Sequence, residues 1–111
     1  MGKGKARPAK RPDLLKRARE LLSTGKYRDT RHAADRRQER GIILPEIQQV
    51  IEGGWNEKSK DEFKVEWSAW NYAIRGKTVD RRELRVAIAF VEEDSLLIIV
   101  TAIDLQTERT R

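Results

Sequence analysis

The sequence predicts an α+β domain in which two to three N-terminal helices pack on one face of an antiparallel sheet of three to four strands. Between residues 13 and 53, apolar side chains recur at the three- and four-residue spacing of helices. Between residues 84 and 103 they first alternate and then run continuously, as in strands. A chain of 111 residues is long enough for one domain with a modest core. We therefore expect a single α+β domain over residues 13–105.

The first predicted helix covers residues 12–23. Its apolar residues follow the i, i+1, i+4, i+7, i+8 pattern that places side chains on one helical face; they are Leu14, Leu15, Ala18, Leu21 and Leu22. Gly25 follows this range and suits the left-handed backbone that often ends a helix.

A second helix is predicted over residues 31–40, between a capping Thr30 and Gly41. Two alanines are its only apolar residues, so we expect either a mostly solvated helix or a polar stripe that meets an anion. Side chains four residues apart are neighbours on a helix. Three residues with this spacing would share one row: His32, Arg36 and Arg40.

A third helix is predicted to begin with Pro45 in its first turn, where the missing N–H costs nothing, and to end at Gly53 and Gly54. Its apolar stripe consists of Ile43, Ile47, Val50 and Ile51.

The second half of the chain predicts strands. Residues 84–91 alternate between large apolar side chains and smaller or charged ones, and residues 96–103 are nearly all apolar and β-branched. A polar turn at 92–95 joins them, so we expect an antiparallel hairpin. Residues 70–75 form a further predicted strand, which the polar segment 76–82 connects to the hairpin.

Residues 55–69 fit two patterns. Phe63, Trp67 and Trp70 have helical spacing, whereas Phe63, Val65 and Trp67 alternate as in a strand. We favour a strand here.

Positive charge is concentrated at the N-terminal end. Residues 1–40 carry 14 Lys and Arg against 5 Asp and Glu, although the whole chain has a net charge of only +6. An electropositive half attracts polyanions such as nucleic acid. Residues 1–12 are basic and almost without large apolar groups, so we expect a disordered tail, or alternatively an arm that binds nucleic acid. Residues 106–111 are expected to form a flexible C-terminal tail.

Composition argues against several classes of site. With no Cys and one His, the chain offers no disulfide, no thiol nucleophile and no multi-histidine metal site. The longest apolar run, Leu96 to Val100, is far below the roughly 18 residues that span a bilayer, and the N-terminus lacks the apolar core of a signal peptide. We therefore expect no metal, no cofactor, no membrane association and a cytoplasmic location.

The polar row of the second helix is one candidate site. Histidine is the side chain best suited to proton transfer near neutral pH, so His32 would move protons, while Arg36 and Arg40 would contact phosphate. The alternative is structural: the histidine packs or caps near the helix start, and the arginines pair with neighbouring carboxylates.

One face of the predicted sheet is a second candidate. Arg85 and Arg75 share it with small alanines, which leave room for a phosphodiester backbone, and Thr101 would add a hydrogen-bonding group. The alternative is that the alanines admit a closely packed helix and the arginine stems cover apolar surface. Several aromatic side chains, Trp67 and Tyr72 among them, could stack on bases or pack in the core.

Parts of the chain resemble a known family. Thr30-Arg31-His32-Ala33 with Arg36, Arg40 and Gly41, then Pro45-Glu46-Ile47, Tyr72-x-Ile74-x-Gly76, Leu84-Arg85-Val86 and Ile98-Ile99-Val100-Thr101 resemble the bacterial domain-of-unknown-function family DUF4258 over about residues 28–104. That family resembles the RelE and BrnT toxin-like folds, small α+β domains that include metal-independent ribonucleases of toxin–antitoxin modules. The site residues that the resemblance implies are His32, Arg36, Arg40, Tyr72, Arg85 and Thr101. The first predicted helix, the basic tail and the long segment 57–68 depart from the family pattern.

These observations lead to one main hypothesis, a small RNA-directed protein with metal-independent endoribonuclease activity. His32 or Tyr72 would move protons, and Arg36, Arg40 and Arg85 would hold the charge of the reacting phosphate. A cognate antitoxin-like protein would then be a partner. The alternative is a noncatalytic module that binds nucleic acid or protein, and a third possibility is a structural accessory domain. The oligomeric state cannot be predicted from the sequence.

Overall fold

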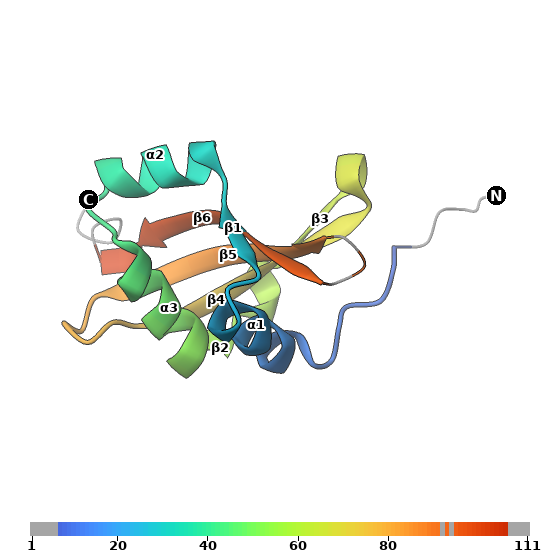
Figure 1. Cartoon of the computed structure of the whole chain (residues 1–111), viewed down its shortest axis with the longest axis horizontal. Helices are drawn as coiled ribbons and strands as arrows, with labels where there is room; N and C mark the ends of the chain where they lie inside the picture. Colours follow the sequence, from blue (N-terminus) through green and yellow to red (C-terminus); the bar gives the residue numbers. More distant parts are fainter. Residues whose placement is uncertain (1–6, 92, 94, 107–111) are drawn as a thin grey trace.

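The computed structural model describes residues 7–91, 93 and 95–106, and over these residues the chain forms three α-helices and one sheet (Figure 1). The α+β class predicted from the sequence is confirmed. The helices do not form one uninterrupted N-terminal block, because a strand lies between the first and the second. None of the helices described is long and apolar enough to cross a membrane.

Two helices cover one face of the sheet. They are α1 (Leu14–Ser23) and α3 (Leu44–Gly53), and their apolar stripes point into a common core. This core is completed by alternate residues of the central strands: Tyr72, Ile74, Leu84, Val86, Ile88, Phe90, Leu97 and Ile99. The face that the sequence assigned to helix packing is therefore confirmed.

The third helix, α2 (Arg31–Glu39), lies along the edge of the sheet instead of on its face (Figure 1). The Thr30 hydroxyl accepts a hydrogen bond from the Ala33 N–H at 3.1 Å, so the predicted cap is confirmed. Just before it, β1 (Tyr27–Asp29) runs parallel to the last strand. An ion pair between Arg37 and Asp29 ties the helix to β1.

The sheet has six strands, more than the three to four predicted. The order is β1-β6-β5-β4-β2, with β3 paired to β4 outside this path. The three long strands are β4 (Ala69–Lys77), β5 (Glu83–Val91) and β6 (Leu96–Asp104). The additional strands β1, β2 (Trp55–Asn56) and β3 (Glu62–Lys64) have only two or three residues, too few to show alternation in a sequence.

The segment whose pattern was ambiguous contains both short strands and single helical turns. Between β2 and β4 the chain forms η1 (Lys58–Lys60), β3 and η2 (Val65–Trp67). Gly54, directly before this segment, lies in close contact with β4. A Cβ atom at this position would lie 2.4 Å from the carbonyl oxygens of both Arg75 and Val50, so only glycine fits without movement.

Residues 7–12 differ from the expected disordered tail, since they lie against β4. The indole Nε1 of Trp70 donates a 2.8 Å hydrogen bond to the Pro8 carbonyl, and the Arg11 N–H donates one of 2.8 Å to the Tyr72 hydroxyl. The Lys10 ammonium lies 2.9 Å from a carboxylate oxygen of Asp61.

The remaining parts of the predicted tails, residues 1–6 and 107–111, lie outside the described residues. Gln106 is described, and its N–H donates to Asp104.

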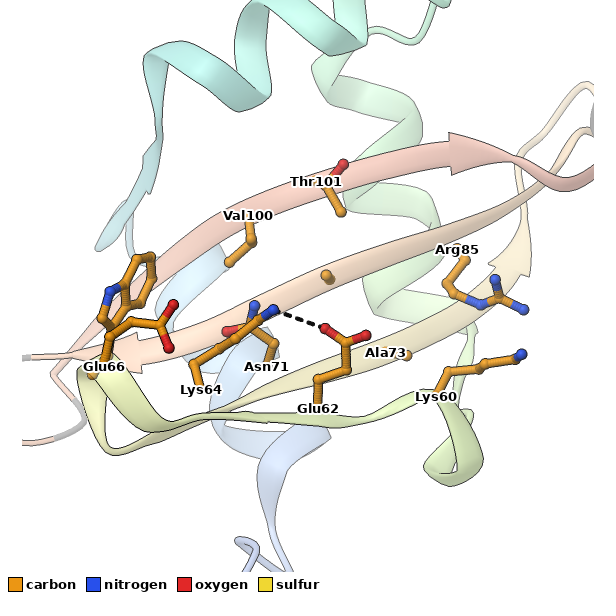
Figure 2. A pocket seen from close by; sticks show the side chains of 11 residues that line it. Lys60, Glu62, Lys64, Glu66, Asn71, Ala73, Arg85, Val100 and Thr101 are labelled. Atoms are coloured by element: carbon orange, nitrogen blue, oxygen red, sulfur yellow. Dashed lines mark ion pairs between the residues drawn. The ribbon is translucent and has the colours of Figure 1, made fainter.

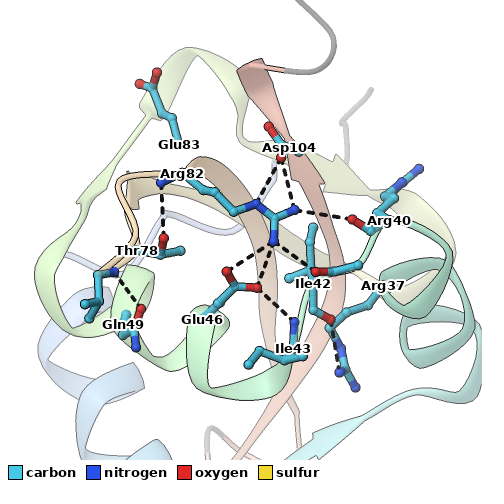
Figure 3. A network of polar contacts seen from close by, with 12 residues as sticks. Arg37, Arg40, Ile42, Ile43, Glu46, Gln49, Thr78, Arg82, Glu83 and Asp104 are labelled. Atoms are coloured by element: carbon cyan, nitrogen blue, oxygen red, sulfur yellow. Dashed lines mark hydrogen bonds and ion pairs between the residues drawn. The ribbon is translucent and has the colours of Figure 1, made fainter.

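A network around Arg82 joins the ends of four elements (Figure 3). The guanidinium group of Arg82 donates to both carboxylate oxygens of Glu46 on α3 and to one of Asp104 on β6, over 3.0–3.1 Å. It also donates to the carbonyls of Arg40 and Gly41, which follow α2. One side chain thus fixes α2, α3 and the β6 end against the start of β5.

Candidate functional site

A lined hollow lies on the face of the sheet opposite α1 and α3 (Figure 2). Its volume is about 450 Å³. The strands β4, β5 and β6 form its floor, and the segment from η1 through β3 to η2 forms a wall along one side. The lining residues are Lys60, Glu62, Lys64, Glu66, Trp67, Asn71, Ala73, Arg85, Ala87, Val100 and Thr101.

The floor of the hollow consists of small side chains, which leave the space above the sheet unfilled. Ala73 of β4 is paired with Ala87 of β5, and Ala87 is paired with Thr101 of β6, so three short side chains form a line across the sheet. The space above them stays open because no helix packs on this face among the described residues. The prediction that alanines leave room beside arginines on this face is confirmed; the helix considered as their alternative occupant is not found there.

A β-bulge in β6 turns Thr101 toward the hollow. Ile88 pairs with Ile99 while the preceding Ala87 pairs with Thr101, so Val100 is an extra residue in β6. In a regular strand, residues 99 and 101 would point to the same face. The bulge places Ile99 in the core and both Val100 and Thr101 along the hollow.

The wall of the hollow depends on the alternation of β3. Phe63 points away from the hollow and meets Trp70 edge to face, with 5.5 Å between ring centroids. The neighbours of Phe63, Glu62 and Lys64, therefore point into the hollow, where they form a 2.9 Å ion pair. The hydrogen bond that the Lys64 ammonium donates to Glu62 raises the pKa of Lys64, which keeps this group charged.

The ends of the wall present two further groups. Trp67, in η2, is 59% exposed although it lines the hollow, so one side of its indole is open to a ligand. Lys60, the last residue of η1, lies at the other end, and its ammonium has no hydrogen-bond or ion-pair partner among the described residues.

Arg85 occupies the end of the floor near Lys60, and Arg75 adjoins it through Glu57. Arg85 donates to Glu57 at 2.8 Å, and Arg75 donates to the same carboxylate at 3.0 Å and to Glu83 at 2.8 Å. The hydrogen bond from Arg85, followed by that from Arg75, holds the pKa of Glu57 below its usual value despite the opposing effect of burial. Glu57 therefore stays ionised and keeps the two guanidinium groups side by side.

Asn71 lies on the β4 side of the hollow, opposite Glu62 in the β3–β4 pairing. Only 7% of this residue is exposed. Its Oδ1 is buried and has no hydrogen-bond partner among the described residues. Buried carbonyl groups are almost always hydrogen-bonded, so the unpaired Oδ1 of Asn71 beside the hollow requires an explanation.

The site residues predicted from the sequence do not lie together in the structure. Arg85 and Thr101 line the hollow together, and Arg75 adjoins Arg85 through Glu57. Tyr72 lies on the opposite face, 3% exposed in the core, where its hydroxyl contacts the N-terminal segment.

The predicted row on α2 does not form a pocket with Arg85. His32 and Arg36 are exposed on α2, and neither lines the hollow. Arg40 is half-buried, and its guanidinium donates to the Ala102 carbonyl at 2.7 Å, so it binds the exposed edge of β6. The helix packs through Ala33, Arg37 and Arg40, a different stripe from the predicted one. The hypothesis that Arg36, Arg40 and Arg85 hold one reacting phosphate requires a shared pocket, and no such pocket occurs in the described part of the chain.

Most residues of the wall were missed by the sequence analysis. A usable signal was present, because charged Glu62, Lys64 and Glu66 alternate with apolar Phe63, Val65 and Trp67. What the pattern could not reveal is that the polar side of this short strand faces the open side of the main sheet. No group of three or more His, Asp or Glu residues that could hold a metal ion occurs among the residues described.

Comparison with known proteins adds one relationship. No curated protein matches this chain. The profile of a family described as "Domain of unknown function (DUF4258)" matches residues 30–104, from the cap of α2 to the end of β6. This match covers more than half of the chain and includes both the wall and the floor of the hollow. The chain therefore belongs to the DUF4258 family.

Proposed function

We propose that this protein is a cytoplasmic RNA-directed protein that binds single-stranded RNA in the hollow on the open face of its sheet. The observation that carries the proposal is the combination in one hollow of an unpaired ammonium, a guanidinium and a largely exposed indole: Lys60, Arg85 and Trp67. Cations bind the phosphate backbone, and exposed aromatic rings stack on unpaired bases.

The charges of the chain support this choice. Two carboxylates of the hollow wall, Glu62 and Glu66, reduce its local positive charge. The 14 basic residues among positions 1–40 compensate for this, because a positive field over the N-terminal half steers a polyanion toward the protein. A folded RNA duplex is too wide for a hollow of about 450 Å³, whereas a splayed single strand offers the separate bases that it can hold.

Binding of a fluorescent single-stranded RNA, measured over a range of salt concentrations, tests the proposal. Each lost phosphate contact on a single strand reduces the slope of log K against log salt by about 0.7. We expect Lys60→Gln to produce this reduction, while the matched control Lys16→Gln, on α1 behind the sheet, leaves the slope unchanged. Trp67→Ala should weaken binding by about tenfold, from the loss of one base stack. Equal effects of the Lys60 and Lys16 substitutions would refute the proposal.

Cleavage of the bound RNA is a second candidate, favoured by the Glu62–Lys64 pair in the wall. A carboxylate can take the proton of a 2′-hydroxyl as its oxygen attacks phosphorus, and an ammonium can donate a proton to the departing 5′-oxygen. Arg85 would stabilise the charge of the pentavalent phosphate. His32 and Tyr72, which the sequence analysis assigned to proton transfer, lie outside the hollow.

RNA cleavage in EDTA separates the two candidates. If cleavage occurs, Glu62→Gln should abolish it without abolishing binding, and His32→Ala should leave it unchanged. Binding without cleavage by the wild type would leave a noncatalytic RNA-binding module. An antitoxin-like protein partner stays a prediction; bound over the hollow, it would compete with RNA in the same binding assay.

A further inference from the structure

Asn71 differs from the other asparagine of this chain in its hydrogen bonding. The chain has two asparagines, and their environments differ. The Nδ2 of Asn56 donates to the Asp61 carboxylate and to the Ala73 carbonyl, both at 3.0 Å. The Oδ1 of Asn71 is buried and has no hydrogen-bond partner within the described residues, and the whole residue is only 7% exposed.

An unpaired buried carbonyl destabilises a fold, because the group loses its hydrogen bonds to water and gains none in return. A leucine of similar size would pack at position 71 without this cost. The sheet tolerates asparagine at a position that borders the hollow, directly across from Glu62. A polar group retained at such a cost is explained if a ligand supplies the missing donor.

A carboxamide recognises a flat ligand edge that offers a donor beside an acceptor. Asn71 sits in a hollow that also contains the exposed indole of Trp67 and a floor of alanines, an arrangement suited to a flat ring. Asparagine pairs with adenine through two parallel hydrogen bonds: its Oδ1 accepts from the 6-amino group and its Nδ2 donates to the adjacent ring nitrogen N7.

We propose that Asn71 reads an unpaired adenine of the bound RNA, and this inference rests on the proposed function. Guanine is disfavoured because its 6-carbonyl and N7 are both acceptors, which leaves the Oδ1 without a donor. Pyrimidines lack the second ring that increases stacking on Trp67. Asn71 therefore determines the base preference, while Lys60 and Arg85 supply affinity that does not depend on sequence.

The test compares two RNA probes, a short oligouridine with one central adenosine and the same oligomer with purine riboside, which lacks the 6-amino group. The wild type should bind the adenosine probe about tenfold more tightly, the equivalent of about 1.4 kcal/mol. Asn71→Leu should bind both probes equally, with an unchanged dependence on salt.

Stability provides the second readout. Asn71→Leu should melt at or above the wild-type temperature, because it removes an unpaired polar group. The matched variant Asn56→Leu should melt at a lower temperature, because it breaks two hydrogen bonds. A purely structural role for Asn71 predicts instead that both variants melt lower and that the base preference survives in Asn71→Leu.

The failures can be told apart. If the wild type binds RNA with the expected dependence on Lys60 but does not distinguish the two probes, this inference is wrong and the proposed function stands. If Asn71→Leu retains the preference, the inference is equally wrong. If the wild type binds neither probe, both the proposed function and this inference are wrong.

Discussion

Replacement of Arg82 by methionine should clearly destabilise the domain. Methionine retains the apolar stem of the side chain but removes the guanidinium group. The variant loses the hydrogen bonds to Glu46 and Asp104 and those to the carbonyls that follow α2. Glu46 and Asp104 then both lose the charge that the guanidinium group supplies.

The expected loss of unfolding free energy depends on how deeply the ion pairs of Arg82 are buried. Removal of one partner from a fully buried ion pair costs about 3–5 kcal/mol. The side chains of Arg82, Glu46 and Asp104 are 26%, 11% and 14% exposed, so water compensates in part and the lower end of this range applies. We therefore expect a loss of about 3 kcal/mol in unfolding free energy. For a domain of this size, each kcal/mol lowers the melting temperature by about 4–8 °C.

Urea denaturation followed by circular dichroism measures this loss, with Arg81→Met as the matched control. Arg81 is the neighbouring residue in the same turn, and its side chain is exposed. Its replacement should change the unfolding free energy by less than about 0.5 kcal/mol. If Arg82→Met is destabilised by less than about 1 kcal/mol, the network does not hold the helices to the sheet as described.

Three further substitutions test other parts of the fold. Gly54→Ala should cost more than about 2 kcal/mol, since the new Cβ would clash with two carbonyl oxygens at 2.4 Å; a normal melting temperature would contradict this. The pKa of Glu57 is lowered in the folded state, so its contribution is present above its usual pKa of 4.5 and is lost as the pH falls through the lower folded value. Glu57→Gln should therefore flatten the dependence of stability on pH below about 4.5, and an unchanged acid profile would count against the pairing with Arg85. Thr30→Ala should lose about 1 kcal/mol with the cap of α2, whereas Thr30→Ser should stay close to wild type in the same urea titration.

The helices were well predicted because their signals are local. The cap at Thr30, the apolar spacing of α1 and α3, and the glycines after each helix all act within a few residues of chain. The same holds for the β5–β6 hairpin, whose apolar face is readable from alternation. The short strands β1, β2 and β3 carry no such signal, since their pairing depends on partners that lie far away in the sequence.

The candidate site was predicted only in part. Arg85 and Thr101 were expected on one face of the sheet, and they do line one hollow. The α2 row was assigned to the same pocket because residues 32, 36 and 40 share a helical face. The structure turns this helix onto the β6 edge, where Arg40 binds a backbone carbonyl. Helical spacing defines which residues share a row, but not which neighbour that row meets.

The sequence by itself determined the α+β class, the three helices, the three long strands and the charge asymmetry, because each depends on residues close together in the chain or on composition alone. The tertiary structure decided where the open face lies and what surrounds it. A one-residue bulge at Val100 sends Thr101 to the hollow, and the pairing of β3 with β4 places a polar wall beside an alanine floor. These features arise from register between distant strands, and register is fixed only when the whole core packs.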